Sequence, residues 1–134
     1  MRKDFINPPD SPEPRSYHHA VTVEGGRVIY LSGQVAFDLE RRIVGENDLV
    51  AQTRQAFRNL QIAVEGGGGK LSDIVKLTIY VVNYKAEQMS AVTGVIGEFF
   101  PDESLPANSL IGVESLSTKG LLVEIEGIAV TDAP

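Results

Sequence analysis

The chain has no cysteine, only two histidines and no long run of apolar residues. Without cysteine it can form no disulfide, no thiolate nucleophile and no cysteine-based zinc site. Without an apolar stretch of about 18 residues it is not expected to cross a membrane as a helix. The first ten residues are polar and proline-rich, so they lack the hydrophobic core of a signal peptide, and we expect a cytoplasmic protein.

Positive charge is also scarce. The 12 Lys and Arg residues are outnumbered by 18 Asp and Glu residues, which gives a formal net charge of −6. Nucleic-acid binding needs a basic face that neutralises phosphates. Here the basic residues are scattered, and Arg41-Arg42 is the only basic doublet besides Arg2-Lys3 at the N-terminus. We therefore expect neither nucleic acid nor a membrane among the partners of this protein.

The length of 134 residues fits one domain, and 43% hydrophobic with 22% charged residues is typical of a globular protein. Residues 1–16 hold four of the seven prolines and predict an extended N-terminal arm. The single domain is expected to span residues 17–134.

The pattern after the arm predicts two strands. Residues 17–24 alternate in polarity, and Gly25-Gly26 is a pair that tolerates the positive φ of a hairpin turn. Residues 28–35 are apolar on both faces, so we expect this strand to lie at the centre of the sheet and to pair with the first. Residues 37–45 predict a loop with a short extra strand.

Two helices are expected, at residues 49–65 and 85–100. Asn47 or Asp48 can cap the first helix, and Gly66 to Gly69 end it. Pro101 ends the second. The apolar stripe of the first helix consists of Val50, Phe57, Leu60 and Val64, with Thr53 in the gap. The stripe of the second consists of Met89, Val92, Ile96 and Phe99.

Three further strands follow from alternation, at residues 72–83, 108–113 and 121–130. On the first, we expect one face to consist of Val75, Leu77, Ile79 and Val81. On the last, Glu124 and Glu126 share one face, opposite an apolar face of Val123, Ile125 and Ala129.

The element order is therefore β-β-α-β-α-β-β, an α/β (α+β) domain with a mixed sheet. Strand–helix–strand connections place both helices on one face of the sheet. The other face is left uncovered and is expected to carry Leu110, Leu122 and Ile128 along with the acids. An open apolar face on a small domain favours self-association as a closed ring.

Three local motifs have ordinary explanations. The run from Gly66 to Lys70 follows a helix and precedes a strand, the reverse of a phosphate-binding loop, so it is expected only to end the helix. His18 and His19 are adjacent on a strand and point to opposite faces, which argues against one shared metal ion. Glu124 and Glu126 are either an acid/base pair, or one lies at an interface and the other is solvated. Burial would raise the pKa of a carboxyl group, which suits proton transfer near neutral pH.

The remaining motifs are modest one by one but specific in their order and spacing. They are Tyr17, LSGQV at 31–35, Gln55 and Asn59, DIVK at 73–76, FFP at 99–101, Pro106-Ala107 and VEIEGIAV at 123–130. Together they resemble the RidA/YjgF family, collinearly from residue 17 to residue 130.

This resemblance implies a chorismate-mutase-like fold and a homotrimer with ligand clefts between subunits. Members of the enamine/imine deaminase group hydrolyse reactive 2-aminoacrylate-type intermediates to 2-keto acids and ammonia, with no metal or organic cofactor. By the same resemblance, Glu124 positions or activates the attacking water, and Tyr17, Ser32 and Gly33 bind the substrate.

Two positions depart from the active deaminases. Those enzymes have an arginine after Pro-Ala that binds the substrate carboxylate, where this chain has Asn108, and an asparagine of the second helix is replaced by Thr93. One neutral amide in place of a bidentate guanidinium predicts roughly ten- to thirtyfold weaker carboxylate binding. With no fixed cation expected beside the two acids, Arg15 and Lys119 are the candidates to replace the missing charge.

Three functions remain open from the sequence. The first is imine or enamine hydrolysis with altered specificity, with Asn108 and Thr93 among the substrate-binding residues. The second is a non-catalytic trimer that binds a small metabolite in the same intersubunit cleft. The third, ribonuclease activity, is the weakest because the chain is acidic and lacks a basic groove.

Overall fold

A four-stranded mixed sheet in the order β3-β6-β4-β5 is the centre of this computed structural model, which describes residues 1–132. The strands are β3 (Arg27–Gln34), β6 (Val123–Thr131), β4 (Ile74–Val82) and β5 (Ala107–Val113). β6 runs antiparallel to both of its neighbours, whereas β4 and β5 are parallel. Parallel neighbours need a crossover connection, which α2 supplies.

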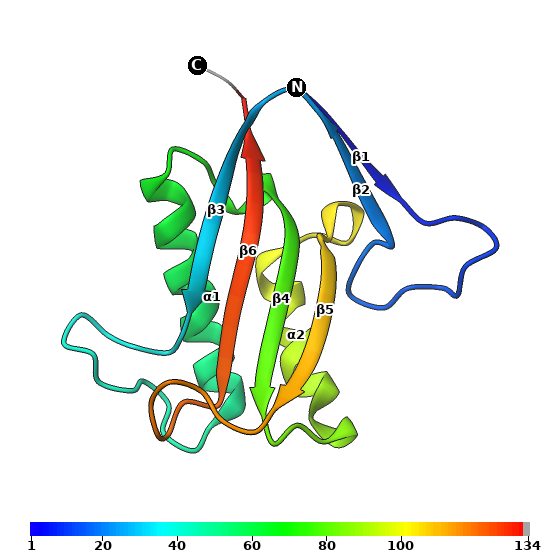
Figure 1. The fold of residues 1–134 in the computed structure, drawn as a ribbon. Coiled ribbons are helices and arrows are strands. Elements are labelled where there is room, and N and C mark those ends of the chain that lie inside the picture. The colour runs from blue at the N-terminus through cyan, green and yellow to red at the C-terminus, as the bar shows by residue number, and fades with distance from the viewer. Residues whose placement is uncertain (133–134) are drawn as a thin grey trace.

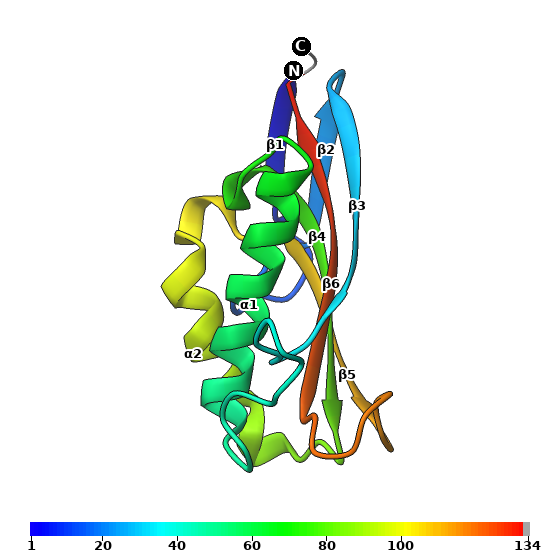
Figure 2. The same cartoon turned by 90° about the vertical axis from the view of Figure 1, so that its left-hand side faces the viewer.

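Both helices, α1 (Leu49–Gly66) and α2 (Met89–Phe99), cover the same face of this sheet, as Figures 1 and 2 show. Short 3-10 turns precede β4, α2 and β5 at Leu71–Asp73, Ala86–Gln88 and Asp102–Ser104. The prediction of an α+β domain with two helices on one face is confirmed. Within the described part of the chain, no helix is both long and apolar enough to span a membrane.

Helix α1 begins where the sequence predicts. Asp48 has extended backbone angles, and its carboxylate accepts a hydrogen bond from the Ala51 N–H at 3.0 Å, so Asp48 is the N-cap. Thr53, Phe57, Leu60 and Val64 are fully buried as expected. The prediction for Val50 is wrong: this side chain is exposed, and the fully buried Gln52 lies inward instead.

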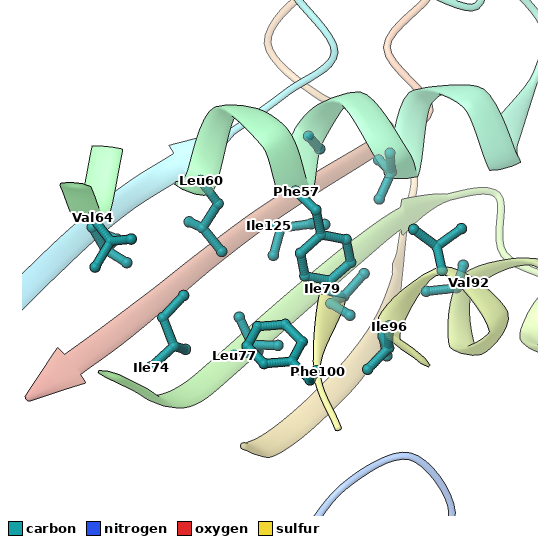
Figure 3. Close-up of a cluster of buried hydrophobic side chains, with 14 of the residues drawn as sticks. Phe57, Leu60, Val64, Ile74, Leu77, Ile79, Val92, Ile96, Phe100 and Ile125 are labelled. Atoms are coloured by element: carbon teal, nitrogen blue, oxygen red, sulfur yellow. The ribbon is translucent and has the colours of Figure 1, made fainter. Parts of the chain in front are cut away.

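The core lies between the helices and the sheet (Figure 3). Phe57 of α1 stacks on Phe99 with ring centroids 5.2 Å apart and meets Phe100 edge-on at 5.9 Å. Each fully buried side chain of this size contributes about 1.5–3 kcal/mol. From α2 the buried residues are Val92, Val95 and Ile96, so the predicted inward position of Met89 is wrong.

Strand β4 buries Leu77, Ile79 and Val81 against the helices, as predicted. At its start, however, Ile74 is buried and Val75 is not. The pairing of β4 with β6 shifts register between Ile74 and Lys76. This irregularity breaks the strict alternation on which the prediction for Val75 depended.

The N-terminal segments form a separate two-stranded ribbon. β1 (Arg2–Ile6), which was not predicted from the sequence, pairs antiparallel with β2 (Ala20–Glu24). Gly25 and Gly26 have the positive φ values expected of them, 76° and 88°, but they form a bend between two separate sheets and not a hairpin turn. β2 does not pair with β3, and the predicted hairpin between them is wrong. β3 is consequently an edge strand, not the central one.

The ribbon turns away from β3 and lies on the β5 side of the sheet (Figure 1). The Lys3 ammonium forms a largely buried ion pair with Asp73 at 3.1 Å, which ties β1 to the segment before β4. The backbone N–H of His18 donates to the Pro106 carbonyl at 3.4 Å, just before β5. No described strand pairs with the outer edge of β3.

The second face of the sheet carries no helix. Tyr30 is 80% exposed there, and Val28 on the same strand is also exposed. Ile128 pairs with Tyr30 and shares this face, as predicted. The prediction for Leu110 is wrong: it pairs with the fully buried Ile79 and packs against the core on the helix side. Leu122 lies just before β6.

Candidate functional site

A β-bulge near the end of β3 places Ser32 and Gly33 beside β6. Leu31 pairs with Gly127, but Gln34 pairs with Ile125, so β3 contains one extra residue between these pairs. Such bulges redirect side chains and interrupt the ladder. Ser32 and Gly33 therefore lie where the backbone of β3 departs from regular pairing, and Gly33 lies next to Glu124.

Gly33 and Glu124 are in close contact. A Cβ atom added to Gly33 would lie 2.7 Å from Cδ of Glu124, which is shorter than any ordinary contact. Only glycine at position 33 lets the carboxyl group of Glu124 lie over the backbone of β3. Glu124 pairs with Tyr80 of β4, so this carboxyl group is on the face of the sheet without helices.

A cavity of about 270 Å³ opens at this point. Its walls come from the end of β3, the loop after it, α1, the loop before β6 and β6 itself. The lining residues are Gly33, Gln34, Val35, Phe37, Arg41, Asn59, Ser117 and Glu124. Gly33 and Glu124 were predicted from the sequence as functional residues, whereas Phe37, Arg41 and Ser117 were not.

Asn59 fixes the wall next to α1. Its amide Nδ2 donates to the carbonyls of Val35 and Phe37, at 2.7 and 2.9 Å, and its Oδ1 accepts from Gln55 Nε2 at 3.1 Å. The helix thereby holds the chain where it leaves β3. From the sequence, Gln55 and Asn59 were only part of the resemblance to the RidA/YjgF family. In the structure they hold the backbone of Val35 and Phe37 in position.

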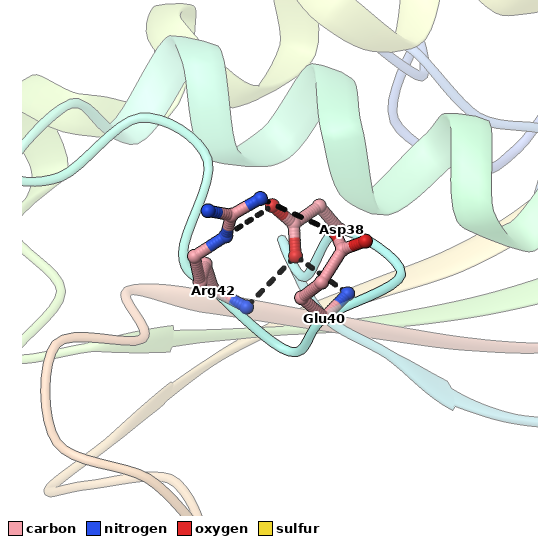
Figure 4. Close-up of polar contacts among 3 residues, drawn as sticks. All are labelled: Asp38, Glu40 and Arg42. Carbon is pink, nitrogen blue, oxygen red and sulfur yellow. Dashed lines mark hydrogen bonds and ion pairs between the residues drawn. The ribbon is translucent and has the colours of Figure 1, made fainter.

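The loop after β3 is closed by Asp38 (Figure 4). Its carboxylate accepts hydrogen bonds from the backbone N–H groups of Glu40 and Arg42, both at 2.9 Å, and from Arg42 Nε at 3.1 Å. The backbone N–H of Arg42 above all holds the pKa of Asp38 below its ordinary value. Phe37 and Ile43 form a single isolated β-bridge across the base of the loop, where a short extra strand was expected.

Arg41 stands at the tip of this loop with φ at 60°, a left-handed conformation that costs a non-glycine residue about 1–2 kcal/mol. Its guanidinium carbon lies 4.8 Å from the centre of the Phe37 ring. The expectation that no fixed cation lies near Glu124 is therefore wrong. Neither Arg15 nor Lys119 lines this cavity; Lys119 lines two other hollows beside Gly120.

The second acid of β6 has different surroundings. Glu126 is exposed and accepts a hydrogen bond from the Tyr80 hydroxyl at 3.1 Å. This bond raises the pKa of Tyr80, since it stabilises the neutral phenol. Glu126 does not line the cavity of Glu124, so the two acids do not form one acid/base pair within a single chain.

The other predicted site residues lie elsewhere in the chain. Tyr17 lines a separate cavity of about 460 Å³ together with His18, Leu105 and residues 7–9 and 11–14 of the N-terminal segment. Asn108 pairs with the fully buried Leu77, which puts its side chain on the helix side, and its Oδ1 is buried without a partner among the described residues. Thr93 is half-buried on α2. Of the predicted site residues, one copy of the chain thus brings together Gly33 and Glu124, whereas Ser32 precedes Gly33 on β3 but does not line the cavity.

The two histidines are engaged by backbone carbonyls. His18 Nδ1 lies 2.7 Å from the Leu105 oxygen, and His19 Nε2 lies 2.6 Å from the Pro12 oxygen. A carbonyl only accepts, so each of these ring nitrogens carries the proton and donates it. Both side chains hold the segment between β1 and β2 in place. No three His, Asp or Glu residues among residues 1–132 gather as a metal site.

Comparison with known proteins agrees with this architecture. A family model described as Endoribonuclease L-PSP matches residues 9–131. The 2-iminobutanoate/2-iminopropanoate deaminase of Dermatophagoides farinae is 36% identical over 131 residues, 97% of this chain and 98% of that protein. A RutC family protein of Pyrococcus abyssi is 32% identical over 96% of this chain and 98% of its own length.

Solved structures share the fold. The Rid family protein YyfB of Yersinia pestis, whose function is described as unknown, superposes with a TM-score of 0.92 at 37% identity, over 98% of this chain and 100% of that one. The YjgF gene product of E. coli gives a TM-score of 0.68 at 32% identity, over 85% of this chain and 87% of that one. Fold and site together define a small α+β protein of the chorismate-mutase-like, YjgF type. The chain belongs to the RidA/YjgF family.

Proposed function

We propose that this protein hydrolyses reactive imine or enamine metabolites to a carbonyl product and ammonia. The observation that carries the proposal is the carboxyl group of Glu124, which packs over the backbone of Gly33 at the wall of a small cavity. The family relationship supports it, because a relative that spans almost the whole chain is named as an imine deaminase.

The chemistry requires one base and one water molecule. Glu124 accepts a proton from the water while the oxygen forms a bond to the imine carbon and the C=N electron pair moves to nitrogen. Glu124 returns this proton to the nitrogen, which gives a neutral carbinolamine. Glu124 then takes the hydroxyl proton and passes it to the amino nitrogen, so that the C=O bond of the product forms as the C–N bond breaks and ammonia leaves. An enamine enters the same path after protonation of its carbon. A positioned carboxylate of this kind contributes about 10²- to 10⁴-fold in rate.

We propose further that a second copy of the chain completes the site, within a homotrimer. Gly33 and Glu124 line one cavity, with Ser32 next to Gly33 on β3. Tyr17 lines another cavity beside the start of β5, and Asn108 is two residues beyond Pro106. A contact between unlike surfaces of neighbouring copies can bring these groups together and also cover Tyr30 and Val28 on the open face. Thr93 is proposed to bind substrate from the same second copy.

Turnover can be tested with 2-aminoacrylate generated in situ, with keto-acid formation as the readout. We expect Glu124→Gln to lower the rate about 100-fold or more. The matched control is Glu126→Gln, two residues along the same strand and outside the cavity, which should retain nearly full activity. Equal rates for the wild type and Glu124→Gln would refute the hydrolase. Ligand-dependent thermal stabilisation without turnover would instead favour the non-catalytic binding protein.

The composite site has its own test. Glu124→Gln and a Tyr17→Ala, Asn108→Ala double variant should each be inactive. Refolding them together should restore part of the activity if each pocket takes its two halves from different copies. No restoration in mixed assemblies, with their composition verified by native mass spectrometry, would place the whole site within one chain.

A further inference from the structure

Arg41 is a charged group that the proposed reaction leaves without a role. Arg41 lines the same cavity as Glu124, and within residues 1–132 no carboxylate forms an ion pair with its guanidinium. Its neighbour in sequence differs: Arg42 is paired with Asp38 at 3.1 Å and with Glu40 at 3.3 Å. The basic doublet is thus divided between one residue that closes the loop and one that faces the cavity.

The cavity needs a cation if its substrate carries a carboxylate. Glu124 by itself repels an anion, and the whole chain has a formal charge of −6. The arginine expected after Pro-Ala is replaced by Asn108, whose side chain is directed to the helix side of the sheet. Among the residues that line this cavity, Arg41 is the only one with a positive charge.

The loop holds Arg41 ready for such a contact. Asp38 fixes the backbone on both sides of the tip through the N–H groups of Glu40 and Arg42 (Figure 4). The ring of Phe37 supports the guanidinium at 4.8 Å, and Asn59 in turn holds the Phe37 carbonyl at 2.9 Å. A guanidinium that is supported on an aromatic ring still has N–H groups with which to bind a carboxylate.

We propose that Arg41 binds the carboxylate of the substrate and thereby selects small 2-imino acids, with the imine end toward Glu124. This inference rests on the proposed hydrolase function for its reaction, but the anion-binding role can be measured separately. A cavity of about 270 Å³ suits a substrate of a few carbon atoms. Arg41 thus takes the task of the missing arginine from a different element of the fold.

The kinetic experiment compares Arg41→Gln, Arg41→Lys and, as a charge-matched control, the exposed Arg58→Gln on α1. With a 2-imino acid as substrate, we expect Arg41→Gln to raise KM about ten- to thirtyfold with little change in kcat, because a charged hydrogen bond is lost. The KM of Arg41→Lys should lie between those of the wild type and Arg41→Gln, since lysine keeps the positive charge but lacks the planar guanidinium group. Arg58→Gln should match the wild type, and a neutral imine should be hydrolysed equally by all four proteins.

Binding of 2-oxobutanoate, a carboxylate that resembles the product, separates the two proposals. We expect calorimetry to detect binding to the wild type and to Arg58→Gln, and at least tenfold weaker binding to Arg41→Gln. Equal binding by Arg41→Gln and the wild type, or no binding to the wild type, would overturn the role of Arg41. If the wild type binds 2-oxobutanoate more tightly than Arg41→Gln does but hydrolyses no imine, the anion-binding role of Arg41 is supported and only the hydrolase proposal is refuted.

Discussion

Gln52 connects the two loops that enclose the Glu124 cavity. Its side chain is fully buried on α1. Nε2 donates to the Gly45 carbonyl at 3.1 Å and to the Gly120 carbonyl at 3.0 Å, and Oε1 accepts from the Leu122 N–H at 2.9 Å. One amide thus joins the loop that carries Arg41 to the loop that carries Ser117. We predict that replacing Gln52 by methionine destabilises the protein while keeping the volume.

The size of the effect follows from these contacts. Each of the three hydrogen bonds contributes about 0.5–1.5 kcal/mol net, and a backbone group left buried without a partner costs about 1–3 kcal/mol. The Gly120 carbonyl is in an exposed residue and can bond to water, so not every group is orphaned. We expect a loss of about 2–4 kcal/mol. At about 2.1 cal/mol/K of unfolding entropy per residue, this corresponds to a decrease in Tm of roughly 7–14 °C.

The assay is thermal and urea unfolding at one fixed protein concentration, because association would make Tm depend on concentration. Gln61→Met provides the control: this glutamine is on the same helix, and its Nε2 bonds only to the exposed Glu65. We expect the control to lie within about 0.5 kcal/mol of the wild type. If Gln52→Met also stayed within about 0.5 kcal/mol of the wild type, the assignment of Gln52 as the connection between the loops would be wrong.

Three further predictions concern single positions. Gly33→Ala should displace the Glu124 carboxyl group and lower activity by up to about 100-fold, with little change in Tm because the side chain that must move is flexible; unchanged kinetics would contradict this. The folded-state pKa of Asp38 is depressed, so its hydrogen bonds should stabilise the loop above the unfolded pKa of about 3.9 and be lost as pH falls through the lower folded value. The Arg42 amide shift, followed by NMR, should show this step in the wild type and not in Asp38→Asn. Gly94 is on the exposed face of α2, where an added Cβ meets nothing within 4 Å. Gly94→Ala should therefore raise the free energy of unfolding by about 0.5–1 kcal/mol, and a lower free energy of unfolding in urea denaturation would contradict this.

Much of the fold could be predicted from the sequence because periodic burial determines it. The helices, the inward face of β6 and the Asp48 cap all follow from patterns within one segment. The place of β3 could not be predicted in this way. Apolar residues on both faces indicate what a strand packs against, not which strands it pairs with, and Tyr30 is exposed in the single chain. β1 is short and polar, so it has no pattern of its own.

The candidate site was predictable only in part. Glu124 and Gly33 could be identified from motif and resemblance, and the structure brings them into contact. The contribution of Arg41 depends on a loop that the Asp38 side chain closes and on the bulge in β3, which forms only where this strand pairs with the distant strand β6. The trimer and the roles of Thr93 and Asn108 stay predictions, since the structure describes a single copy of the chain.

The unpaired outer edge of β3 has a practical consequence. In an antiparallel ladder, alternate residues direct their backbone N–H groups toward the neighbour, so about half of the β3 amides are bonded to β6 and the others point outward. The outward amides are free to exchange hydrogen with deuterated water as long as no other strand lies beside them. Their exchange rates, measured over a dilution series, would therefore report whether and at what concentration a further strand covers this edge.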